Sequence, residues 1–160
     1  MKSKKENIAE YILYLWQLED YLRAFPEQAS SNTELMEIAD MMYSEGIMEG
    51  GHLQLAQNAL EEMEELHNEL VETEAPYRAV IMHLEPRLNL LKAKTNNPLM
   101  SDVEACLTLL YQVILLRLKQ QEISAETDEV VKDATQLMRF LSKTYYDDNQ
   151  TAIWTYLRLV

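Results

Sequence analysis

Residues 8–25 carry the strongest helical pattern in the chain, and that pattern contains a carboxylate where an apolar side chain is expected. At about 100° per residue, the apolar side chains of this stretch fall on one side of a helix, and Glu19 lies in the middle of them. A carboxylate buried without a partner is very costly. We therefore expect the fold to bury Glu19 and to supply it with a partner. The apolar set consists of Ile8, Ile12, Leu15 and Leu22.

Stripes of this kind recur along the whole chain with few interruptions. The 160 residues include only three Gly and four Pro, which favours long helices over many short strands. A chain of this length is expected to form one domain with a substantial core. We predict an all-α, single-domain antiparallel helical bundle of about six helices. The stripes and breaks place these helices at about residues 8–25, 33–45, 53–72, 76–94, 102–118 and 125–146.

The fifth of these helices is apolar nearly all round, which predicts a central place in the bundle, packed against the first helix. Ser101 and Glu104 have the spacing of a capping box at its start. Near its end, Arg117 projects from the most apolar side. The chain therefore combines a misplaced Glu19 with a misplaced cation, and we expect the two to pair.

Two interpretations of this polar set remain open. Arg23, four residues after Glu19, is a local alternative partner to Arg117, while Asp20 points outward and His52 follows a glycine-rich stretch. One interpretation is an internal ion-pair network that fixes the helix register. The other is a ligand pocket in which two guanidinium groups bind a carboxylate or a phosphate.

The net charge of −13 is concentrated in one part of the chain. Residues 24–77 hold 13 acidic side chains and no Lys or Arg, while the remainder holds 14 of each sign. Such a surface repels phosphate backbones, so no nucleic-acid partner is expected. It is either a solvated face or a docking face for a basic partner. The candidate docking residues are Glu61, Glu62, Glu65 and Glu69.

Several kinds of chemistry lack a sequence signal. The single cysteine, Cys106, lies in an apolar run, which excludes an intramolecular disulfide and a Cys-based zinc site. Two Glu-x-x-His spacings, at 49–52 and 64–67, lie about 22 Å apart along one helix, too far to share a metal pair. No nucleophile-elbow, P-loop or dinucleotide motif occurs. We expect no metal and no cofactor, and the lack of these motifs favours a non-enzymatic role without deciding it.

The chain ends carry no membrane signal. Acidic residues interrupt the first apolar stretch and no cleavage site follows, so a signal peptide is not expected. No segment is apolar for long enough to span a bilayer, and a cytoplasmic location is expected.

At the other end, DDNQ at 147–150 predicts a turn. We expect a bundle domain at residues 1–148, and an apolar tail at 149–160 that docks through Trp154, Leu157 and Val160 on the bundle or on a second subunit.

Three blocks of the sequence resemble a known family. They are NIAEYILYLWQLEDYLRA, EGIMEGGHLQLAQN and DVEACLTLLYQVILLRLKQQEISAET, and they lie in order between Asn7 and Asp148. The chain resembles a family of small all-helical bacterial proteins known only as a domain of unknown function, with WQxED and LLLRL-like blocks as its most specific parts. The resemblance implies an all-α fold in a cytoplasmic setting, and no activity. The chain departs from the family pattern in the region of the second helix and in the tail.

These observations favour a non-enzymatic protein-interaction or scaffold bundle that self-associates as a homodimer or binds another protein. The alternative is a small-ligand-binding or enzymatic bundle built on Glu19, Arg23 and Arg117, with His52 beside them.

Overall fold

A computed structural model describes residues 3–159 of the chain, with side chains described for residues 3–150. The described residues form helices joined by loops and turns, and they contain no strand. The all-α prediction of about six helices is therefore confirmed. The elements are α1 (Ile8–Ala24), the short 3-10 helix η1 (Pro26–Ser30), α2 (Thr33–Glu45), α3 (Gln54–Thr73), α4 (Ala75–Lys94), α5 (Asp102–Leu118) and α6 (Ala125–Leu159).

The chain divides into two compact units, residues 1–61 and 62–160, with the division inside α3. The expected packing of the first helix against the fifth involves both units and stays a prediction.

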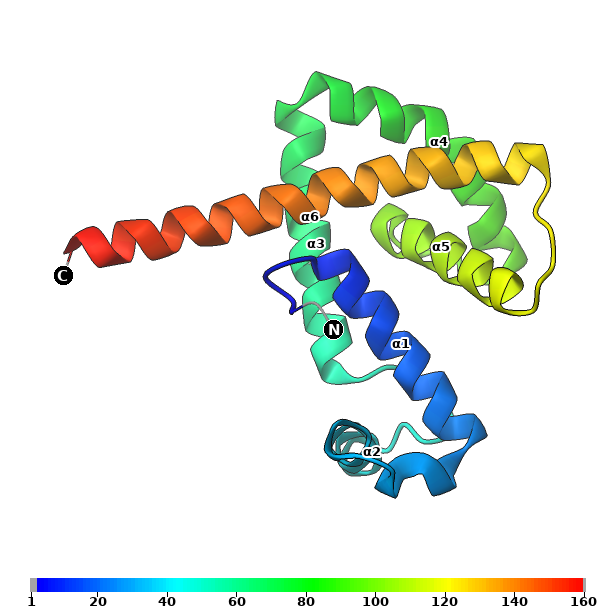
Figure 1. The fold of residues 1–160 in the computed structure, drawn as a ribbon. Coiled ribbons are helices and arrows are strands. Elements are labelled where there is room, and N and C mark those ends of the chain that lie inside the picture. The colour runs from blue at the N-terminus through cyan, green and yellow to red at the C-terminus, as the bar shows by residue number, and fades with distance from the viewer. Residues whose placement is uncertain (1–2, 160) are drawn as a thin grey trace. The chain divides into compact units, whose positions relative to one another are not determined.

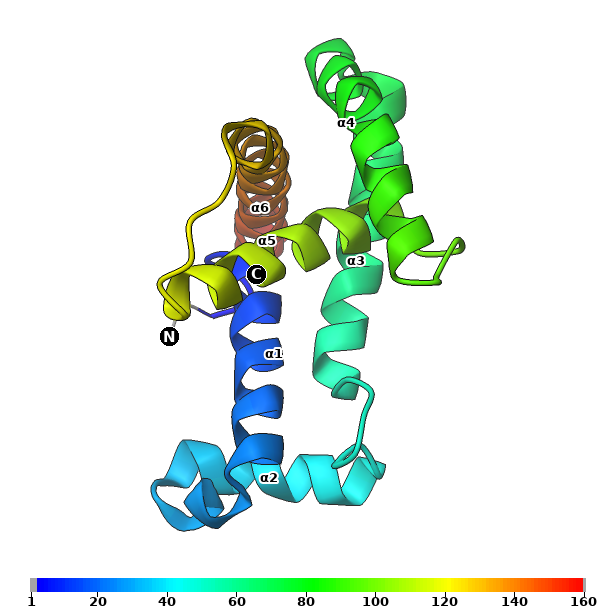
Figure 2. The ribbon, with the colours of Figure 1, turned by 90° about the vertical axis from the view of Figure 1, so that its right-hand side faces the viewer.

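The first unit is built from α1, η1, α2 and the start of α3. The side chain of Asn7 accepts a hydrogen bond from the backbone of Glu10 and begins α1, and Asn32 begins α2 in the same way. Gly46 ends α2 with a φ of +70°, which a residue without Cβ adopts at no steric cost. Figure 2 shows α2 beside the end of α1 that leads into η1. The largest buried side chains of this unit are Ile8, Ile12, Leu15, Leu22, Met42 and Leu53.

The second unit packs α4, α5 and α6 against one another, as Figure 1 shows. Each of these three helices contacts the other two, so the central place predicted for α5 stays a prediction. Ser101 accepts a hydrogen bond from the backbone of Glu104 at 3.1 Å, as the capping signal predicts. The unit's largest buried side chains are Met63, Leu84, Leu88, Leu107, Leu137 and Leu141.

The structure corrects the expectation that Arg117, projecting from the most apolar side of the helix, is a buried or half-buried cation. Its side chain is exposed, although helical periodicity places it on an apolar side of α5. The reason is its position along the helix, because Arg117 lies in the last turn, where Leu118 is also 71% exposed. A cation at that position is favoured by the partial negative charge of the helix C-terminus and needs no acidic partner.

The turn predicted at residues 147–150 is wrong, because α6 continues through it. No Gly or Pro lies between 125 and 160, so nothing in the backbone stops the helix. Local polar contacts also support it: Lys143 and Asp147 pair at 3.9 Å, and the Asn149 amide donates to the carbonyl of Tyr145 at 2.8 Å. The predicted docking of Trp154, Leu157 and Val160 lies outside the residues whose side chains are described. None of the helices in the described part is both long and apolar enough to cross a bilayer.

Candidate functional site

Glu19 is fully buried in the first unit, as its helical position predicts. One carboxylate oxygen lies 2.7 Å from Nδ1 of His52, and the other accepts the backbone N–H of Leu53 at 2.8 Å. Leu53 directly precedes α3, so the carboxylate caps the start of that helix from a distant part of the chain. Negative charge is favourable at a helix N-terminus. Both oxygens of Glu19 are thus engaged within its own unit.

His52 is the most accessible member of this group, with 36% of its side chain exposed. Its ring stacks on Trp16 with 4.9 Å between ring centroids and 26° between the planes. A carboxylate oxygen can only accept, so Nδ1 of His52 donates a hydrogen bond to Glu19, and in that neutral tautomer the lone pair lies at Nε2. The arrangement therefore orients an imidazole whose second nitrogen is able to accept a hydrogen bond.

Arg23 binds the loop between α2 and α3 and not Glu19. Its Nε and Nη2 atoms donate to the carbonyl of Ile47 at 3.2 and 2.8 Å, and Nη2 also donates to the carbonyl of Gly51. Its Nη1 atom lies 3.4 Å from a carboxylate oxygen of Asp20, which is half exposed. The pairing of Glu19 with Arg23 or Arg117 is therefore corrected. The partners of the Glu19 carboxylate are a histidine and a backbone amide. Both belong to the loop that follows α2.

The structure thus brings four of the five predicted network residues together in the first unit, and Arg117 belongs to the second. Glu19 and Arg23 connect α1 to the loop between α2 and α3 through hydrogen bonds to three backbone groups. These hydrogen bonds hold the loop between α2 and α3 against α1. Both charged groups have their polar atoms turned toward the protein backbone, which is the arrangement expected of buried polar side chains.

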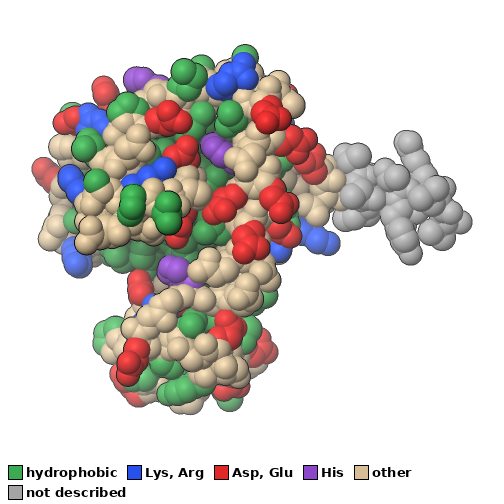
Figure 3. All heavy atoms as spheres, turned by 180° about the vertical axis from the view of Figure 1, so that it is seen from behind, with side chains coloured by type: hydrophobic (Ala, Val, Ile, Leu, Met, Phe, Trp, Pro, Cys, Tyr) green, Lys and Arg blue, Asp and Glu red, His purple; other side chains and the backbone are tan. Residues whose placement is uncertain are grey.

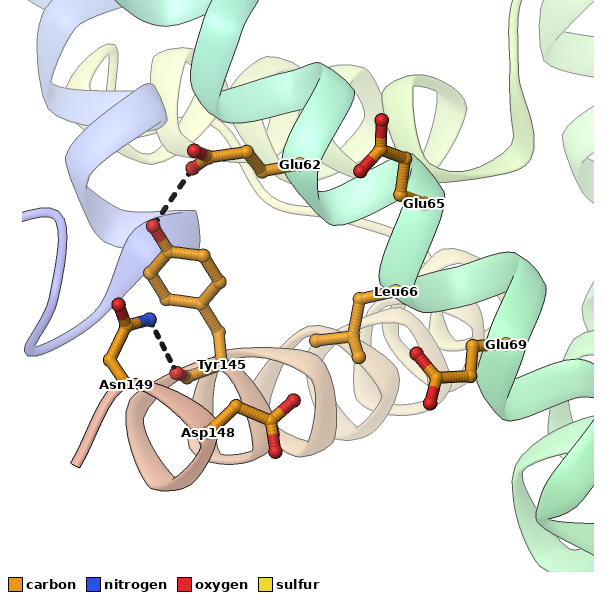
Figure 4. A pocket seen from close by; sticks show the side chains of 7 residues that line it. All are labelled: Glu62, Glu65, Leu66, Glu69, Tyr145, Asp148 and Asn149. Carbon is orange, nitrogen blue, oxygen red and sulfur yellow. Dashed lines mark hydrogen bonds between the residues drawn. The ribbon is translucent and has the colours of Figure 1, made fainter. Parts of the chain in front are cut away.

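A second polar region lies between α3 and α6 of the second unit. It is a groove of about 330 Å³ with acidic side chains on both sides, shown in Figure 4. Helix α3 contributes its carboxylates at a spacing of three to four residues, which places them on one face. We refer to it as the acidic groove. Its lining consists of Glu62, Glu65, Leu66, Glu69, Tyr145, Asp148 and Asn149.

Tyr145 joins the two sides of the acidic groove. Its hydroxyl donates to a carboxylate oxygen of Glu62 at 2.8 Å, as the dashed line in Figure 4 indicates. Partial burial, followed by the hydrogen bond and charge of Glu62, raises the pKa of Tyr145 to about 12. The hydroxyl therefore stays protonated at neutral pH and continues to donate.

The other carboxylates of the acidic groove lack this kind of partner. Within the part of the chain that has described side chains, Glu65, Glu69 and Asp148 form no ion pair, and no Lys or Arg lines the groove. All three are exposed. Figure 3 shows acidic side chains in several groups over one face of the molecule, with apolar and basic side chains between them. Like charges that share one groove repel each other, and a bound cation relieves that repulsion.

The sequence indicated one side of this groove. Of the four predicted docking residues, Glu62, Glu65 and Glu69 line it, and Glu61 does not. Sequence reasoning missed the α6 side, because DDNQ was interpreted as a turn. Tyr145 and Asp148 are three residues apart, so on a continuous helix they lie on the same face. That spacing was the signal in the sequence for the α6 side of the groove.

A third polar region surrounds His67, a buried residue of α3. His67 is 8% exposed and lines a cavity of about 590 Å³ together with Arg78 and Asp102. Its Nδ1 atom lies 2.6 Å from the hydroxyl of Tyr77. Burial lowers the pKa of His67, opposed by the charge of Asp102, and burial raises the pKa of Tyr77. Both groups are therefore neutral at pH 7.

The lowered pKa of His67 makes stability depend on pH. The unfolded chain binds a proton at His67 near the ordinary pKa of about 6.5, and the folded chain does so only at lower pH. We expect the stabilisation that depends on neutral His67 to be complete above pH 6.5. It should be lost as the pH falls from 6.5 toward the lowered pKa of His67 in the folded chain. Urea unfolding at pH 7.5 and 5.5 measures the change.

The matched variants separate this histidine from the other groups that titrate. His67→Gln keeps a side chain able to accept from Tyr77 and cannot titrate, so its stability should fall less between the two pH values than that of the parent chain. His83, which is 79% exposed, provides the control His83→Gln. Equal pH sensitivity in the parent and in His67→Gln would contradict the expectation.

Among the described residues, no group of three or more His, Cys, Asp or Glu side chains is arranged to hold a metal ion. Burial raises the pKa of Cys106 to about 12, so its thiol stays protonated in the core.

Comparison with known families agrees with the blocks noted in the sequence. The family model described as a domain of unknown function, DUF4924, matches residues 1–34 and 25–152. The chain belongs to the DUF4924 family. The expected family membership is thereby confirmed. No curated protein matches the chain, and no solved structure does. The DUF4924 match includes the Glu19 group and the whole acidic groove, and it assigns an activity to neither.

Proposed function

We propose that this protein is a non-enzymatic interaction module whose acidic groove binds a lysine- or arginine-rich segment of a partner protein. One observation carries the proposal: Glu65, Glu69 and Asp148 line one groove without an ion pair among the described side chains. A cationic side chain entering there gains three nearby opposite charges.

The shape of the acidic groove supports the same class of partner. Carboxylates project from α3 on one side and from α6 on the other, and Leu66 lies between the two helices (Figure 4). A segment with basic side chains and an apolar contact complements such a lining. Leu66 is buried, and the amphipathic ring of Tyr145 is half-buried beside it.

The competing proposal of a ligand-binding or enzymatic site at Glu19, Arg23 and Arg117 has less support. The Glu19 and Arg23 groups that would contact a ligand already bond the protein, and Arg117 is exposed. Self-association through residues 149–160 remains a separate proposal, motivated by the apolar composition of that tail.

The test of the acidic groove uses two variants with the same change in charge. Glu65→Gln, Glu69→Gln and Asp148→Asn are combined in one chain, and Glu37→Gln, Asp40→Asn and Glu49→Gln in the control. All six side chains are exposed. A fluorescent peptide with Lys at i, i+4 is titrated at 50 mM and 200 mM salt. We expect the groove variant to weaken binding by about tenfold and the control by less than about threefold.

Glu62 is left unchanged because its bond to Tyr145 holds the groove together. Equal weakening in the groove and control variants would assign peptide binding to the general negative charge and refute the acidic groove as the site. Binding that does not weaken at higher salt would refute the electrostatic basis of the proposal.

A further inference from the structure

Helices α4, α5 and α6 of the second unit enclose an open groove with a largely aliphatic lining. Its volume is about 290 Å³, close to the lower end of the range for small-molecule sites. Each of the three helices contributes, so the shape depends on their packing and not on a flexible loop. The apolar lining includes Leu88 and Leu91 from α4, Leu109 and Leu116 from α5, and Val130 from α6.

This aliphatic lining is incompletely covered. Leu90, on the same stretch of α4, is 55% exposed, while Leu88 is fully buried at the base. Covering exposed aliphatic surface is favourable by about 25 cal/mol per Å². An occupant with an alkyl chain would gain this contribution along the length of the groove.

The charge of the lining contrasts with that of the whole chain. The chain carries a net charge of −13, yet no carboxylate lines this groove and two cations do, Arg87 and Lys94. Arg87 forms an ion pair with Glu126. Lys94 is exposed and has no ion pair within residues 3–150. Gln112 and Thr127 add an amide and a hydroxyl that are able to donate hydrogen bonds.

We propose that this groove binds the anion of a free aliphatic carboxylic acid. The alkyl chain lies along the leucines, and the carboxylate meets the ammonium of Lys94; Gln112 and Thr127 belong to the same lining. One unpaired cation matches a monoanion. No carboxylate lines the groove, so an anionic ligand is not repelled there as it is over much of this acidic protein. Helix α3 contributes nothing to the lining, so the proposal is independent of the acidic groove.

Calorimetric titration of the full chain with octanoate and decanoate tests the proposal. Each added methylene is expected to tighten binding about fourfold, so decanoate should bind at least about tenfold more tightly than octanoate. Octylamine presents the same alkyl chain with the opposite charge and should not displace bound octanoate, even where it binds the acidic groove. Lys94→Glu should weaken octanoate binding about fivefold, and Lys119→Glu, an exposed lysine outside the groove, by less than about twofold.

A second pair of variants tests the aliphatic part. Leu90→Glu places a carboxylate in the groove at an exposed position, and Leu99→Glu makes the same change at a residue 94% exposed outside it. We expect only Leu90→Glu to weaken decanoate binding by about tenfold or more. Because both leucines are exposed, neither variant should unfold the chain, and circular dichroism checks this.

Three results would overturn the proposal. The first is no heat or chemical-shift change with millimolar decanoate. The second is equal octanoate binding by the parent chain and by Lys94→Glu, which would remove the role of Lys94. The third is a dimer in light scattering that Leu90→Glu converts to a monomer while decanoate binding is unchanged. That result would assign the groove to a second copy of the chain.

Discussion

Glu19→Ala is expected to lower the free energy of unfolding by roughly 3 kcal/mol. The substitution removes the acceptor of the buried Leu53 N–H and the partner of the His52 ring. A buried donor left without a partner keeps its full desolvation cost, and the start of α3 loses its negative cap. Urea unfolding monitored by circular dichroism measures the loss.

Two further variants control this measurement. Glu37→Ala makes the same chemical change at an exposed helical position in the same unit, and should alter stability by less than about 0.5 kcal/mol. Glu19→Gln retains one acceptor and should lie between the two. If Glu19→Ala costs no more than Glu37→Ala, then the buried carboxylate does not stabilise the first unit.

Leu107→Ala is expected to cost roughly 2–5 kcal/mol, because Leu107 is fully buried on α5 where that helix packs within the second unit. Leu118→Ala is the matched control on the same helix. Leu118 is 71% exposed, so its replacement should cost less than about 0.5 kcal/mol. Both are read from the midpoint of urea unfolding at an unchanged m-value.

The contrast between the two leucines tests how α5 is used. The sequence of α5 is apolar nearly all round, yet its buried residues lie mostly in its first half. Similar losses for Leu107→Ala and Leu118→Ala would mean that the last turn of α5 is covered in solution. That outcome would also call into question the exposure of Arg117 in the same turn.

The burial of Glu19 and the choice of its partner differ in how far they follow from the sequence. Helical periodicity alone placed Glu19 among apolar side chains, and the structure buries it. Its partners were not predictable in this way, because His52 and Leu53 lie more than 30 residues along the chain in a loop after another helix. The sequence suggested a cation as the partner of Glu19. A backbone N–H does not depend on the type of side chain, so the sequence does not identify it as a partner.

The acidic groove shows the same division. The spacing of Glu62, Glu65 and Glu69 on one helix face is a local property and was visible in the sequence. Asp148 joined them only because α6 continues past a stretch whose composition favours a turn. Intrinsic propensity is a weak signal, and the absence of Gly and Pro over this helix outweighed it.

The sequence by itself determined the all-α class, the number of helices, the cap at Ser101 and the burial of Glu19. These features depend on periodicity and on bonds within a few residues, which the order of amino acids specifies directly. The tertiary structure decided which groups satisfy Glu19, where Arg117 meets water, and which carboxylates line one groove. Those outcomes depend on packing between distant segments, where side chains compete for the same space and the same hydrogen bonds.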